Sequence, residues 1–177
     1  IKRGRRPVTR KWKDSRGLTL VETLCAVAIL VLLGLLVNTG LNLAMRGYRE
    51  LTAQSELELL GSTLTSALAD ELRYAREVET EADGSVTRFH SHRYNYPDPD
   101  MAYTELKVEN GKLYAGIYQM VPDGAYNHGA YELRPGAFQV TYADGLFRVS
   151  LTVQQAGGGL SRTVEFTVRC LNYKPTT

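Results

Sequence analysis

The sequence predicts an α+β protein in which a long N-terminal helix, transmembrane in its first half, packs against a C-terminal antiparallel β-sheet. Three observations lead to this fold class: an uncharged apolar run, apolar residues at helical spacing after it, and alternation of apolar and polar residues from about residue 78. We divide the 177 residues into a basic leader (1–17), an apolar helix (18–45), its amphipathic extension (46–77) and a sheet domain (78–177).

Positive charge is concentrated in the leader. It holds eight basic residues and one acidic residue, a net charge of +7, whereas the other 160 residues hold 13 basic and 18 acidic ones. This asymmetry is typical of a segment that orients a chain in a membrane, and direct nucleic-acid binding is not indicated. Basic residues before a span stay in the cytoplasm, so the chain after residue 45 is expected outside.

The apolar run extends from Thr23 to Met45, 23 residues without a charge. About 20 such residues in a helix cross the hydrocarbon core of a bilayer. The run is longer than the apolar part of a secretory signal, and no suitable small-x-small cleavage site follows it. We therefore expect a single-pass protein of the cytoplasmic membrane.

Glu22 lies directly before this run and admits two interpretations. In the first, the helix begins at Thr23 and Glu22 is hydrated at the membrane surface. In the second, the chain is cut after Gly17, and the Glu22 carboxylate enters the apolar layer, where an unpaired charge costs up to about 2.5–3.5 kcal/mol at a helix centre. The new α-amino group, cationic near neutral pH, would then pair with Glu22 of its own chain or of a neighbour.

The charged leader, Gly17, the stretch "LTLVE" and the apolar helix resemble the prepilin signature of the type IV pilin and type II secretion pseudopilin superfamily. The resemblance covers about residues 10–75 and implies a pilin-like fold. It implies cleavage between Gly17 and Leu18 by a membrane prepilin peptidase, N-methylation of Leu18, and a role for Glu22 in methylation or subunit docking.

The same resemblance implies a filament subunit with several partners. These are prepilin peptidase, other pilin or pseudopilin subunits, an inner-membrane assembly platform and, before assembly, membrane lipid. The processed chain would reside in a surface filament. A minor pilin or pseudopilin fits better than a major pilin, because Leu18 replaces the more usual Phe and no C-terminal disulfide loop is present.

The sequence departs from the family pattern in the middle of the apolar helix. Many members place a proline about 22 residues into the mature chain, where this chain reads Asn38-Thr39-Gly40. Any melted segment would therefore depend on Gly34, Gly40 and Gly47, since glycine is a weak helix former.

Helical spacing continues after Met45. One face is apolar, formed by Leu57, Leu60, Leu64, Leu68, Leu72 and Ala75. The polar residues are assigned largely to the other faces: Ser55, Glu56, Glu58, Asp70, Glu71 and Arg73. We expect one helix over about 18–77; the alternative is a membrane anchor and a separate docking helix, with a break near Gly47 or Gly61.

The C-terminal part alternates with period two, as in strands with one buried face. The predicted inward residues are Phe138, Val140, Tyr142, Phe147, Val149, Leu151, Val153, Val164, Phe166, Val168 and Cys170. Turns are predicted at Asn110-Gly111, Asp144-Gly145 and Gly157–Gly159. We expect four to six strands laid against the apolar helix face, with Cys170 in the core.

No catalytic motif, metal site or cofactor is predicted, and we do not expect an enzyme. His90 and His92 share a predicted strand face near Asp98 and Asp100, but zinc needs three or four ligands in tight geometry, and His128 lies in a distant loop. Solvent-facing strand residues are the favoured interpretation.

Eight of the eleven tyrosines lie between Tyr94 and Tyr142, which favours packing over an interaction surface. The loop 120–131 is the best candidate for contact with a partner. The alternative to a filament subunit is an anchored extracytoplasmic binding module that is not cleaved.

Overall fold

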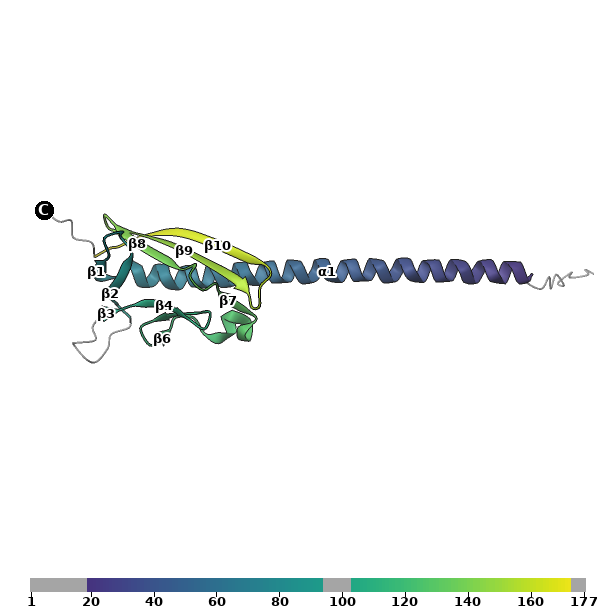
Figure 1. Cartoon of the computed structure of the whole chain (residues 1–177), viewed down its shortest axis with the longest axis horizontal. Coiled ribbons are helices and arrows are strands. Elements are labelled where there is room, and N and C mark those ends of the chain that lie inside the picture. Colours follow the sequence, from purple (N-terminus) through teal and green to yellow (C-terminus); the bar gives the residue numbers. More distant parts are fainter. Residues whose placement is uncertain (1–18, 94–102, 173–177) are drawn as a thin grey trace, which may run out of the picture. The chain divides into compact units, whose positions relative to one another are not determined.

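The computed structural model describes residues 19–93 and 103–172 (Figure 1). The chain separates into two compact units, residues 1–47 and 48–177, which we describe in turn. Helix α1 (Leu20–Arg73) contributes residues to both.

Helix α1 has 54 residues and is assigned as α-helix throughout. Neither a melted segment nor a break is present at Gly34, Gly40, Gly47 or Gly61. The helix ends at Arg73, earlier than the predicted limit near residue 77, and strand β1 begins at Arg76. The predicted single long helix is confirmed.

The globular unit contains ten strands among the described residues, arranged in three antiparallel sheets. The first has the order β1 (Arg76–Thr80), β2 (Val86–His90), β3 (Tyr103–Thr104). The second has the order β4 (Leu106–Glu109), β5 (Lys112–Ala115), β6 (Tyr118–Gln119). In the third, β9 (Leu146–Gln155) pairs with β10 (Ser161–Arg169) and with both β7 (Tyr131–Leu133) and β8 (Gln139–Ala143).

The expectation of one sheet with four to six strands is wrong. Strands β1 to β6 have only two to five residues each. Turns with positive φ at Gly84, Asn110-Gly111 and Gly116 end several of these strands, so they pair with near neighbours and not with the long strands. The predicted class, a helix followed by antiparallel sheet, is confirmed.

The predicted hairpin turns are present. Asn110 and Gly111, with φ of 50° and 72°, join β4 to β5, and Asp144 and Gly145, with φ of 51° and 78°, join β8 to β9. Two successive residues with positive φ match the twist of the strands they connect. Glycine is also required sterically at Gly111, where a Cβ atom would lie 2.6 Å from Cβ of Glu132.

The core of the globular unit lies between the second half of α1 and the sheets (Figure 1). All six predicted apolar residues of the helix face, from Leu57 to Ala75, are at most 2% exposed. Alternate residues of β9 face them: Phe147, Val149, Leu151 and Val153. At Gly61 a Cβ atom would lie 3.1 Å from Cγ2 of Val164, so β10 comes close to the helix at this point.

Cys170 is a core residue, as predicted. It is 5% exposed, and its Sγ donates to the carbonyl oxygen of Ala75 at 3.2 Å. The other cysteine, Cys25, is exposed and also free. The thiol of Cys170 thus joins the end of the sheet to the residues just after α1.

Leu64→Ala is expected to lower the free energy of unfolding by about 2–5 kcal/mol, because a fully buried leucine leaves a cavity that the core fills only in part. Leu59→Ala is the matched control on the same helix, since Leu59 is 63% exposed. It should change stability by less than ~0.5 kcal/mol. Guanidinium unfolding of the full chain in mild detergent, followed by near-ultraviolet circular dichroism, measures both; equal losses would contradict this core.

Candidate assembly site

The N-terminus of α1 is capped by Thr19. The backbone N–H of Glu22 donates to the Thr19 carbonyl oxygen at 2.9 Å and to its Oγ1 at 3.3 Å. Thr19 directly precedes the helix, and Thr19-x-x-Glu22 has the spacing of a capping box. The predicted helix start at Thr23 is therefore wrong, because the helix begins at Leu20, directly after the Thr19 cap. Hydration of Glu22 at the membrane surface stays a prediction.

Glu22 lies in the first turn of α1, where a negative charge interacts favourably with the helix dipole. Its side chain is exposed, and within the described residues its carboxylate forms no ion pair. Gly17 and Leu18 lie outside the described residues. Cleavage, methylation of Leu18 and pairing of Glu22 with an α-amino group therefore stay predictions.

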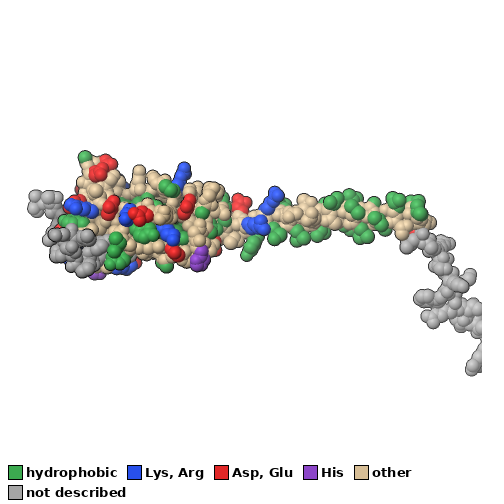
Figure 2. All heavy atoms as spheres, turned by 60° about the horizontal axis from the view of Figure 1, so that its bottom comes forward, with side chains coloured by type: hydrophobic (Ala, Val, Ile, Leu, Met, Phe, Trp, Pro, Cys, Tyr) green, Lys and Arg blue, Asp and Glu red, His purple; other side chains and the backbone are tan. Residues whose placement is uncertain are grey.

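The apolar part of α1 exposes its side chains. Every residue from Thr19 to Gly47 is exposed, including Leu30 at 66% and Leu36 at 69% (Figure 2). Within the described part of the chain, α1 is the one helix long and apolar enough to cross a membrane. These properties are compatible with single-pass membrane anchoring.

The hydroxyl groups inside this stretch bond within the helix itself. Thr23 Oγ1 donates to the carbonyl oxygens of Thr19 and Leu20, each at 3.1 Å, and Thr39 Oγ1 donates to that of Leu35 at 2.8 Å. Such bonds remove the cost of placing a hydroxyl in hydrocarbon. The hydroxyl groups of Thr23 and Thr39 therefore need no hydrogen-bond acceptor from another helix.

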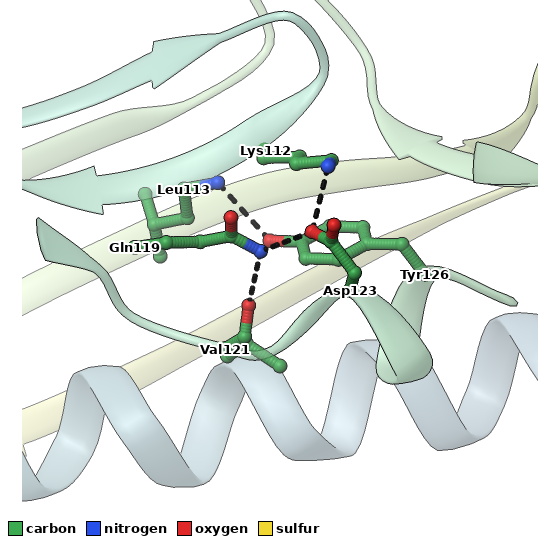
Figure 3. Close-up of polar contacts among 6 residues, drawn as sticks. All are labelled: Lys112, Leu113, Gln119, Val121, Asp123 and Tyr126. Atoms are coloured by element: carbon green, nitrogen blue, oxygen red, sulfur yellow. Dashed lines mark hydrogen bonds and ion pairs between the residues drawn. The ribbon is translucent and has the colours of Figure 1, made fainter. Parts of the chain in front are cut away.

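The loop 120–131 is held by a polar network that sequence reasoning missed (Figure 3). Asp123 Oδ1 accepts from Lys112 Nζ at 2.6 Å and from Gln119 Nε2 at 2.8 Å. The buried Tyr126 hydroxyl accepts the Leu113 N–H at 3.0 Å. Hydrogen bonds from Lys112 and then Gln119 lower the pKa of Asp123, which favours its charged form.

The prediction that this loop is an exposed contact applies to only part of it. Val121, Tyr126 and Tyr131 are buried, whereas Asn127 and His128 are exposed at the end of η2 (Asp123–Gly129). Both exposed residues have positive φ, 47° and 53°. The burial of two tyrosines agrees with the packing interpretation of the tyrosine-rich region.

His90 and His92 contact different residues. His90 Nε2 is 3.4 Å from Glu77 Oε2, and the His90 ring lies 4.3 Å from that of Tyr103. His92 comes after the end of β2, contrary to the predicted shared strand, and its ring packs 5.5 Å from that of Tyr74. Asp98 and Asp100 lie outside the described residues; the described ones contain no group of three metal-ligating side chains.

Glu71 was assigned to the polar faces of the helix, and this assignment is wrong. It is 2% exposed and accepts a hydrogen bond from the Ser91 hydroxyl. Burial raises the pKa of its carboxyl group, while the Ser91 bond and the positive charge of Arg93 act in the opposite direction. Its position three residues after Leu68 was the available signal, because that spacing places it beside the apolar face.

No family model, curated protein or solved structure matches the chain. Its function is therefore inferred from the residues and geometry described above. The features that bear on it are the exposed apolar helix and the acidic residue in the first turn of that helix.

Stability is expected to fall as the pH rises above about 4.5, because the raised pKa makes folded Glu71 bind a proton that the unfolded chain has released. Glu71→Gln should remove this slope, which for one proton cannot exceed about 1.4 kcal/mol per pH unit. Unfolding free energies measured from pH 4 to 7 give the slope. Asp70→Asn, at an exposed neighbour, is the control; identical slopes in the two variants would refute the assignment.

Proposed function

We propose that the chain is the precursor of a filament subunit of the type IV pilin and pseudopilin class, a minor pilin or pseudopilin. It is cut after Gly17 and assembles through its N-terminal helix. The exposed apolar stretch of α1, with Glu22 in its first turn, is the observation that carries this proposal.

The exposed apolar side chains of α1 support a transfer of this helix from the membrane into a bundle of neighbouring helices. Burial of a leucine or valine is worth about 1.5–3 kcal/mol, so a helix with this surface requires cover. Lipid supplies that cover while the chain is in the membrane, and the helices of neighbouring subunits supply it in a filament. The sheet domain stays outside in both states.

Glu22 gains a partner through cleavage in this mechanism. Its backbone N–H is already engaged by the Thr19 cap, while its carboxylate accepts from no group within residues 19–93 and 103–172. A cut after Gly17 removes the basic leader and creates a cationic α-amino group on Leu18, next to the cap. Pairing of this amine with Glu22 of the same or a neighbouring chain neutralises an acid that would be costly in an apolar bundle.

The Thr19 cap, with the T-x-x-E spacing of a capping box, favours a second candidate, an anchored extracytoplasmic binding module that is not cleaved. An acidic side chain three residues after a helix cap is explained by ordinary helix initiation. That role requires neither proteolysis nor a second subunit. The two candidates differ in whether the negative charge of Glu22 matters.

Glu22→Gln separates charge from capping, because glutamine also serves at this position of a capping box. For a filament subunit we expect at least a tenfold loss of protein from the assembled fraction, since the neutral side chain no longer attracts the amine. Quantitative blotting of sheared filaments against membranes measures this loss. Protease accessibility of the sheet domain in intact spheroplasts should stay unchanged.

Glu50→Gln is the matched control, an exposed acid on the same helix beyond the apolar run. Thr19→Ala reports the contribution of the cap alone. Wild-type assembly by Glu22→Gln would exclude the proposed docking role and favour the uncleaved module.

A further inference from the structure

Two asparagines in the apolar part of α1 differ from its threonines in that their side-chain amides are only partly hydrogen-bonded within the helix. Asn42 Nδ2 donates to the main-chain oxygen of Asn38 at 2.9 Å and to its Oδ1 at 3.2 Å. A primary amide has two N–H donors and one oxygen acceptor. Within the described residues, Asn38 Nδ2 therefore donates to nothing and Asn42 Oδ1 accepts from nothing.

The depth of these groups makes them costly. Asn38 precedes Arg46 by eight residues, about 12 Å along a helix axis, and no charged residue lies between them. A polar group without a partner in hydrocarbon costs several kcal/mol. The pair is also exposed on the helix, so no described part of the chain covers either amide.

We propose that the Asn38–Asn42 pair binds the same pair on a second copy of the chain, with Asn38 Nδ2 of one helix donating to Asn42 Oδ1 of the next. The unsatisfied donor and acceptor are complementary to each other, so one neighbouring copy supplies the acceptor that Asn38 needs and another supplies the donor that Asn42 needs. A purely apolar helix, or lipid, supplies neither.

The spacing fixes the register of the contact. Asn38 and Asn42 are four residues apart, so an axial offset of about 6 Å brings the donor of one parallel helix level with the acceptor of its neighbour. Gly34 lies one turn before Asn38, and nothing lies within 4 Å of the position of a Cβ there, which lets a second backbone approach. A head-to-tail contact of this kind repeats from copy to copy.

The inference rests on the proposed function only for the presence of neighbouring copies. Glu22 and Asn42 are 20 residues apart, which at about 100° per residue places them on nearly opposite faces of a helix. The two contacts are therefore made with different neighbours and can fail independently.

Sedimentation equilibrium of the full, uncleaved chain in density-matched detergent tests the contact. We expect the wild type to self-associate and N38L/N42L to associate at least tenfold more weakly. Both changes make the helix more apolar, so poorer insertion into the micelle cannot cause the loss. The matched control is T39V, whose hydroxyl bonds its own helix, and it should behave as wild type.

A mixing experiment separates pairing from a general structural effect. N38L keeps the acceptor of Asn42, and N42L keeps the donor of Asn38. An equimolar mixture should therefore associate more strongly than either variant alone. Loss in the double variant without recovery in the mixture would overturn the proposed pairing.

Wild-type association by N38L/N42L, or an absence of association in the wild type, would also overturn it and would mean that water or lipid satisfies the amides. Because no cleavage is needed, such a result would leave Glu22-dependent assembly untouched. Conversely, loss of Glu22-dependent assembly would leave an observed amide contact standing.

Discussion

Burial of the apolar face on the second half of α1 is the interaction on which the globular unit depends. The helix presents leucines at steps of three and four residues, and β9 presents apolar residues at every second position. The helix and the strand each have an apolar face that neither can bury without the other. Gly61 removes a side chain where β10 comes closest, so helix and strand meet at Val164 without a clash.

The first half of α1 has no such partner among the described residues. It is richer in apolar residues than the second half, but its side chains are exposed, and its polar groups divide into two kinds. The threonine hydroxyls are satisfied by their own helix, whereas the Glu22 carboxylate and the Asn38–Asn42 amides retain unused bonding capacity. In the proposed filament, apolar contacts give adhesion, and these few polar groups set which register of neighbouring helices is preferred.

The features predictable from sequence are those that local spacing determines. The buried residues from Leu57 to Ala75, the turn at Asn110-Gly111 and the core position of Cys170 follow from periodicity and turn chemistry, and all are confirmed. The burial of Glu71 was signalled by its spacing from Leu68, but its partner Ser91 is distant in sequence, and so is Leu113, the partner of the buried Tyr126. The division into three sheets depends on which short strands pair with one another, and local spacing does not determine this pairing. For the site, the Thr19 cap was not predicted, although the T-x-x-E spacing of residues 19–22 was the available signal. Gly17 and Leu18 stay predictions.

Mass spectrometry of the chain recovered from cell envelopes tests the central claim most directly, because the pairing of Glu22 requires a new α-amino group. The account predicts an N-terminal peptide that begins at Leu18 and carries an N-methyl group. A chain that still holds the residues before Gly17, with no species beginning at Leu18, would contradict it.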